Sequence, residues 1–150
     1  MSRSVIRGFR PDLFEAARVD GAKISRSDLA RLAGLKTAET IRRWENGSAS
    51  PQIDLLKRAL AALRIDAVDV IRTDPRERYL SDWRHLRLMT QPQLAQQAGI
   101  ATHLVMRIER GERELTDTIA AGVGTAVQIT VLEVRAAYER ARTRPAGSPA

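Results

Sequence analysis

The sequence predicts an all-α protein made of two similar units of short helices. Three observations support this prediction. No segment alternates apolar and polar residues with the period of two that is typical of a half-buried strand. Apolar residues instead recur at helical spacing, with Pro, Ser, Thr and Asp where helices would begin and Gly where they would end. The chain also resembles itself when it is shifted by 65 residues.

The internal repeat covers most of the chain. With a shift of 65 residues, segment 25–35 falls on segment 90–100, and with a shift of 64, segment 44–69 falls on segment 108–133. One residue was therefore gained in the first unit, or lost in the second, between the turn glycine and Trp44. An internal repeat of this length indicates two copies of one structural unit.

Five helices are predicted in the first unit. The second is the clearest, because Ser25 can cap its first turn and Gly34 can end it with a positive φ. Pro11 suits the first position of the first helix, since its φ is already helical. The other predicted helices run from Thr37 to about Glu45, from Ile53 to Leu63, and through a short segment that begins at Asp66 and Asp69.

The second unit repeats these signals. Asp74, Pro75 and Glu77 have the spacing of an N-terminal cap, and they predict a helix that continues with an apolar face. The later predicted boundaries lie at Thr90, at Gly99 and at Thr130 with Glu133. The pair Gly122 and Gly124 indicates a weak or closely packed helix rather than a phosphate loop. The predicted domains are 1–72 and 73–141, and the Pro-, Gly- and Ser-rich tail 142–150 is predicted to be disordered.

Composition favours a nucleic-acid partner. The formal charge is +7 and the pI is about 10.9, and chains this basic are often held near a polyanion. There is no cysteine, and His85 and His103 lie far apart, so neither a disulfide nor a metal site is expected. Neither a signal sequence nor a membrane span is expected, because the longest uncharged stretch, 118–132, is too short. The cytoplasm, close to the nucleoid, is the expected location.

Helix 37–45 has two different faces. At 100° per residue, Ile41 and Trp44 lie together and predict the buried side. The side chains that point the opposite way are Glu39, Arg42, Arg43 and Asn46. Such a face suits a DNA major groove, since Arg binds guanine, Asn binds adenine and Glu accepts from cytosine. Ser48, in the following turn, could hold a phosphate.

Two stretches resemble the phage-repressor or Xre-type helix-turn-helix family. They read "SRSDLARLAGLKTAETIRRWENGSASP" and "TQPQLAQQAGIATHLVMRIERGE". The resemblance implies two tandem five-helix, lambda-repressor-like domains that bind double-stranded DNA through the start of helix 2 and the exposed face of helix 3. The predicted DNA-binding residues are Arg26, Lys36, Thr37, Glu39, Thr40, Arg42, Arg43, Asn46 and Ser48 in the first unit, and Gln91, Thr102, His103, Met106, Arg107 and Arg110 in the second.

Charge predicts that the first unit binds DNA more strongly. Segment 23–58 holds eight basic and four acidic residues, whereas segment 88–123 holds three basic and four acidic residues. Phosphate attraction scales with the cations at the interface. Glu45 and Glu109 are interpreted as structural residues.

The sequence favours a sequence-specific DNA-binding transcriptional regulator, and not an enzyme, because no nucleophile, acid–base pair or phosphate loop is visible. No cofactor, metal, small molecule or membrane partner is expected. Two alternatives stay open. One is a protein-interaction module, such as an antitoxin, with a homodimer or another protein bound through the second domain and its C-terminal helix. The other is a non-specific nucleoid-type DNA binder.

Overall fold

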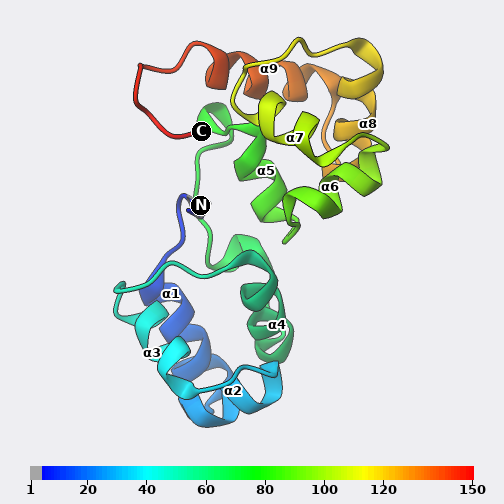
Figure 1. Ribbon diagram of the computed structural model, residues 1–150. Coiled ribbons are helices and arrows are strands. Elements are labelled where there is room, and N and C mark those ends of the chain that lie inside the picture. Colours follow the sequence, from blue (N-terminus) through cyan, green and yellow to red (C-terminus); the bar gives the residue numbers. More distant parts are fainter. Residues whose placement is uncertain (1–4) are drawn as a thin grey trace. The chain divides into compact units, whose positions relative to one another are not determined.

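A computed structural model describes residues 5–150 and divides the chain into two compact units, Met1–Arg72 and Thr73–Ala150 (Figure 1). Every regular element among the described residues is a helix. The β contact there is an isolated antiparallel bridge between Phe9 and Ile71. The all-α prediction is confirmed for this part of the chain.

The first unit packs its helices around an aliphatic and aromatic core. Phe14, Leu29, Ile41, Leu56 and Leu60 are fully buried. The elements are α1 (Pro11–Ala16), a π-helical turn η1 (Ala17–Ala22), α2 (Arg26–Ala33), α3 (Ala38–Glu45), α4 (Ile53–Leu63) and a 3₁₀ turn η2 (Ala67–Asp69). These bounds follow the predicted ones closely, because each boundary is set by a local cap that the sequence displays.

The caps of α2 illustrate this local control. The Oγ of Ser25 accepts a hydrogen bond from the backbone N–H of Asp28 at 3.0 Å, and Gly34 ends the helix at φ 68°. Both features were predicted. Thr37 occupies the N-cap position of α3 as predicted, but its side chain accepts no capping hydrogen bond.

The second unit follows the same order of elements with two changes. Its elements are a 3₁₀ turn η3 (Pro75–Glu77), α5 (Leu80–Leu86), α6 (Gln91–Ala98), α7 (Thr102–Glu109), α8 (Asp117–Val127) and α9 (Val131–Arg142). The expected single helix from Pro75 is interrupted, because Arg78 is extended and the Asp82 carboxylate caps a new helix at the Tyr79 N–H. The boundaries at Thr90 and Thr130 are confirmed, since both residues form capping boxes.

The structure places the two insertions in the first unit. Arg18 and Ser25 are one residue further apart than their counterparts Arg84 and Thr90, and the π-helical turn η1 absorbs the difference. A π turn closes on the fifth residue, so it takes up an additional residue without ending the helix. The other insertion is Lys36, which lengthens the turn before α3.

The two units close their cores differently. In the first unit the N-terminal segment does so, since the Arg10 N–H donates to the Val70 carbonyl and the Arg72 N–H donates to the Gly8 carbonyl, both at 2.8 Å. In the second unit α9 takes this place and contributes four buried residues, Val134, Ala137, Tyr138 and Ala141. Its length pins the loop after α7.

Gly122 lies where two helices of the second unit approach closely. A Cβ atom at this position would lie 2.7 Å from the backbone carbonyl oxygen of Ala98, at the end of α6. The neighbouring Gly124 would bring a Cβ to 2.9 Å from the carbonyl oxygen of Ile129. Close packing therefore explains the glycine pair, in agreement with one of the two sequence interpretations.

Gly47 and Gly111 form a matched pair that separates backbone strain from steric clash. Both have positive φ, 76° and 71°, but only Gly111 is crowded, since a Cβ there would lie 2.6 Å from the Arg142 Cα. We expect Gly47→Ala to cost about 1 kcal/mol from the left-handed backbone, and Gly111→Ala to cost about 2–4 kcal/mol, since α9 must also shift. Urea unfolding of the two variants measures both losses. Equal losses would contradict the close approach.

Segment 143–150 follows α9, and Arg144 lies against the second unit. Its guanidinium donates to the backbone carbonyls of Arg110, at 2.6 Å, and Ser148, at 2.8 Å. Arg142 itself is the last residue of α9, so the helix extends one residue beyond the predicted domain. Disorder of the tail stays a prediction.

None of the described helices is by itself long and apolar enough to cross a membrane. The pair α8 and α9 meets the length and composition criteria only when the two helices are taken together, and they meet at 104°.

Candidate nucleic-acid interface

Each unit contains two short helices joined by a glycine turn. In the first unit α2 and α3 are joined through Gly34, and in the second α6 and α7 are joined through Gly99, at φ 68° and 72°. A glycine at this point lets the chain reverse direction without a steric penalty. This arrangement is a helix-turn-helix geometry in both units.

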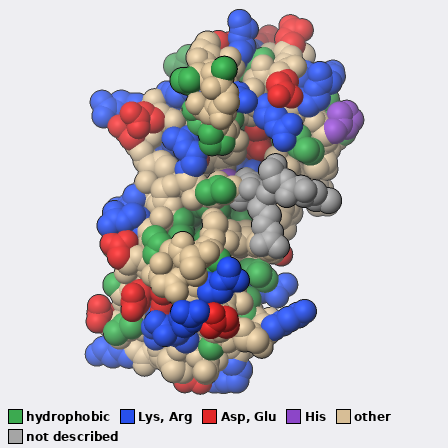
Figure 2. All heavy atoms as spheres, turned by 60° about the vertical axis from the view of Figure 1, so that its left-hand side comes forward, with side chains coloured by type: hydrophobic (Ala, Val, Ile, Leu, Met, Phe, Trp, Pro, Cys, Tyr) green, Lys and Arg blue, Asp and Glu red, His purple; other side chains and the backbone are tan. Residues whose placement is uncertain are grey.

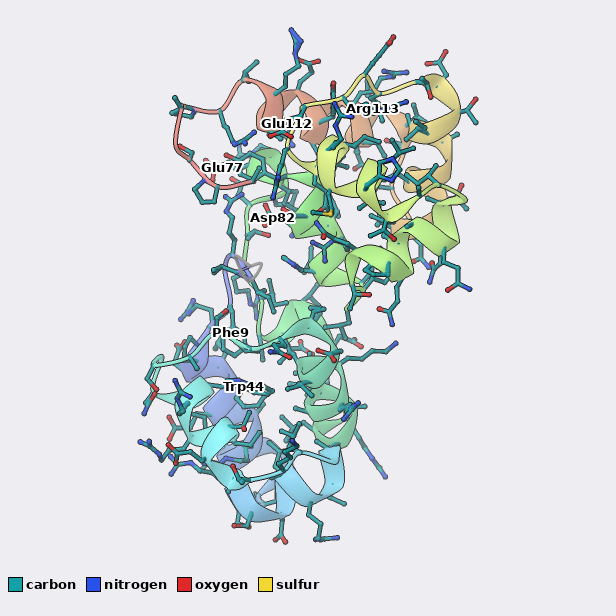
Figure 3. The ribbon with its side chains drawn as sticks, in the orientation of Figure 1. Phe9, Trp44, Glu77, Asp82, Glu112 and Arg113 are labelled. Carbon is teal, nitrogen blue, oxygen red and sulfur yellow. The ribbon has the colours of Figure 1, made fainter. Side chains whose placement is uncertain are left out.

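The first turn is anchored by an aromatic cluster. Trp44 points from α3 into the interior of the first unit (Figure 3), and its side chain is buried together with that of Ile41. Its ring meets Phe14 edge-on, with the ring centroids 5.8 Å apart, and Phe14 in turn lies 5.9 Å from Phe9. In the second unit the smaller Val105 and Ile108 take the positions of Ile41 and Trp44. The opposite face of each third helix is consequently held toward solvent.

The exposed face of α3 carries both signs of charge. Arg42 donates from Nε and Nη2 to the carboxylate of Glu39, three residues earlier on the helix. This hydrogen bond is the main reason that the pKa of Glu39 lies below its usual range. Arg43 forms no side-chain hydrogen bond or ion pair with the residues described, so its guanidinium is the free cation of this face.

The other predicted residues of the first unit surround this helix. Lys36 and Thr37 are exposed in the turn before it, and Thr40 is half-buried on its side. After the helix, Asn46 accepts a hydrogen bond at its Oδ1 from the Ser48 N–H, at 2.9 Å. The Asn46 side chain therefore shapes the turn, and its amide N–H₂ is left to face solvent. Figure 2 shows Lys, Arg and acidic side chains side by side on the lower part of the drawn face, over α3.

The corresponding face of α7 has a different character. The structure places Met106 at the position of Arg42, Arg107 at that of Arg43 and His103 at that of Glu39. All three are exposed, with Met106 at 37%. Thr102 is half-buried, and Arg110 is exposed just beyond the helix. The face therefore lacks the carboxylate–guanidinium pair of α3.

Behind the first face lies a buried ion cluster. Glu45, whose side chain is 1% exposed, accepts from Nε and Nη2 of Arg18 at 2.7–3.2 Å. Arg18 also donates from Nη1 to the Ile24 carbonyl at 2.9 Å. A second guanidinium, that of Arg26, lies with its Nε 3.4 Å from both oxygens of the same carboxylate. Glu45 thus ties α1, α2 and α3 together.

The second unit builds the same cluster from its own residues. The Glu109 carboxylate accepts from Nε and Nη2 of Arg84 at 2.7 and 3.1 Å, and Arg84 Nη1 donates to the Met89 carbonyl at 2.9 Å. Here the third member is Gln91, whose Nε2 donates to Glu109 at 2.9 Å. The structural interpretation of Glu45 and Glu109 agrees with both clusters.

Sequence reasoning missed Arg18 and Arg84. Both lie on the buried side of a first helix, where a charged residue is unusual unless it is paired. The signal was present, because the two arginines coincide when the chain is shifted by 66 residues. Their partners could not be read from the sequence, since 27 and 25 residues separate each arginine from its glutamate.

A comparison with protein-family models bears on the first unit. Residues 14–70 match a family model described as helix-turn-helix. These residues form a helix-turn-helix domain. The matched range runs from α1 to η2 and contains the exposed face of α3. The match supports a DNA-binding regulator in general and is consistent with a protein that is not an enzyme. No significant match was found among curated proteins or among solved structures.

Proposed function

We propose that the protein is a sequence-specific DNA-binding transcriptional regulator, and that α3 of its helix-turn-helix domain enters the major groove. The observation that carries the proposal is the face of α3, where the free guanidinium of Arg43 stands beside the Glu39–Arg42 pair. Buried Ile41 and Trp44 fix the orientation of that face. An arginine held in this way can donate two hydrogen bonds to a guanine edge.

The second unit is proposed to be a second lambda-repressor-like domain with a different surface. It has the same order of elements and the same buried glutamate cluster as the first. Its α7 presents Met106 where α3 presents Arg42, and a methionine contributes little to base recognition. We therefore propose that the second unit positions the first on DNA, or holds a second protein, rather than reading bases.

Arg43 is expected to carry much of the recognition. In a site selected from random DNA, Arg43→Ala should weaken binding by about 1–3 kcal/mol and relax the preference at one base pair. Fluorescence anisotropy with the selected site and a scrambled site measures both effects. Arg58→Ala, on the exposed side of α4, is the matched control and should keep the preference for the selected site.

Arg107→Ala tests the proposed difference between the units. Since α7 is not proposed to read bases, this variant should leave the sequence preference unchanged. An equal loss of preference in Arg43→Ala and Arg107→Ala would show that both units read DNA. Failure to select any preferred site would support a non-specific DNA binder instead.

The protein-interaction alternative rests on a separate observation. Val131 and Leu132, at the start of α9, are 41% and 79% exposed, and Met106 is exposed on α7. Stoichiometric binding of a second protein, with no retention of DNA at moderate salt, would favour this function. The cytoplasm is the proposed location, since chromosomal DNA is the proposed partner.

A further inference from the structure

The two buried glutamate clusters differ by one unit of charge. In the first, two arginines, Arg18 and Arg26, share the single carboxylate of Glu45, so the cluster has a net charge of +1. In the second, Arg84 alone balances Glu109, and the third member is the neutral Gln91. The rest of the geometry is the same, so the exchange of Arg26 for Gln91 is the difference in charge between them.

The uncompensated charge of the first cluster is located at Arg26. Arg18 is fully engaged, since its three guanidinium nitrogens donate to Glu45 and to the Ile24 carbonyl, and its side chain is only 10% exposed. The Arg26 side chain is 41% exposed, and only its Nε approaches the carboxylate. Both terminal nitrogens of Arg26 are left without a protein acceptor among the described residues.

Arg26 also lies beside the proposed recognition face. After the Arg42 hydrogen bond, the charges of Arg43 and Arg26 both contribute to lowering the pKa of Glu39 on α3. The positive charge of Arg26 therefore acts at the surface that faces DNA in the proposed function. Because Glu45 is buried and held by Arg18, its carboxylate restricts the guanidinium of Arg26 to one side and turns the terminal nitrogens outward.

We propose that Arg26, oriented by Glu45, binds a DNA phosphate, and that Gln91, locked onto Glu109, does not. Glu45 is then a positioning residue that prepares the cation before DNA arrives. This single exchange divides the work between the units, since only the first cluster supplies a spare charge to the phosphate backbone. The inference rests on the proposed function, because it requires that the α3 face meets DNA.

The test is the salt dependence of binding to a random-sequence duplex, measured by fluorescence anisotropy with the full chain. Removing one phosphate contact lowers the slope of log affinity against log salt by about 0.9. Arg26→Gln should therefore show this change, so that its affinity falls about 3.5-fold less than that of the unmodified chain between 50 and 200 mM salt. Arg26→Lys keeps the charge and should keep the slope.

Two control variants separate this role from a general effect of charge or stability. Arg31→Gln removes an exposed arginine of the same helix that lies 3.5 Å from Asp28, and it should leave the slope unchanged. Gln91→Ala alters the matched position of the second unit and should leave both the slope and the affinity unchanged. The two tryptophan indole N–H signals, one from each unit, verify folding of every variant by NMR.

The outcomes distinguish this inference from the proposed function. An unchanged slope in Arg26→Gln, while Arg43→Ala still weakens binding, overturns the role of Arg26 and leaves the proposed function standing. An affinity loss in Gln91→Ala as large as that in Arg26→Gln overturns the division between the units. If the unmodified chain does not bind DNA at all, the proposed function fails first.

Discussion

Glu109→Leu is expected to destabilise the second unit by about 3–5 kcal/mol, because it leaves the guanidinium of Arg84 buried without a counter-charge. Both side chains of this ion pair are almost inaccessible, at 3% and 4% exposure. The variant also removes the acceptor of the Gln91 side-chain amide. Urea unfolding followed through the indole N–H signal of Trp83, which lies in α5, measures the loss in this unit.

The double variant Arg84→Met with Glu109→Leu tests the cause of that loss. It removes both charges together and replaces them with apolar groups, so it should cost less than Glu109→Leu alone. Glu114→Leu is the matched surface control, since Glu114 is exposed, and its effect should stay within about 0.5 kcal/mol. If the double variant loses more stability than the single one, an uncompensated buried charge is not the cause.

Acidification below pH 6.5 is expected to destabilise the second unit through His85. This side chain is 2% exposed, and burial, with a further contribution from the adjacent Arg84 charge, lowers its pKa from 6.5 to about 3. Below pH 6.5 the unfolded chain binds a proton at His85 while the folded chain keeps the imidazole neutral. The stability associated with this neutral imidazole is therefore complete above pH 6.5 and is lost as the pH falls toward 3.

The size of this effect follows from proton linkage. Between pH 7.5 and 5.5 the free energy of unfolding should fall by about 1.4 kcal/mol, and the complete shift corresponds to about 5 kcal/mol. Urea unfolding at the two pH values measures the difference. His85→Leu should abolish it, whereas the exposed second histidine is the control, and His103→Asn should keep it. A drop that persists in His85→Leu would assign the acid sensitivity to other groups.

Most of the helix boundaries could be predicted from the sequence because local chemistry sets them. Ser25 and Thr90 cap α2 and α6, and Gly34 and Gly99 end them, through interactions within a few residues along the chain. The interruption before α5 was the main error. It arises because Asp82 competes as a cap and starts a new helix after Arg78.

The outward direction of the predicted recognition residues followed from helical periodicity alone. Arg42 and Arg43 are exposed while Ile41 and Trp44 are buried, as the 100° spacing requires. What periodicity could not show was how the side chains pair. Arg42 is held by Glu39, so the free charge of this helix is carried by Arg43 alone.

The sequence by itself determined the helical class, the repeat and the two faces of each third helix, since these depend on neighbours three or four residues away. Tertiary structure alone decided the role of the buried arginines. Arg18 and Arg84 meet their glutamates only when the first and third helices of a unit pack together. Burial then makes that pairing obligatory, because a lone charge in the interior is strongly destabilising. The same packing leaves Arg26 with a spare charge and Gln91 with none.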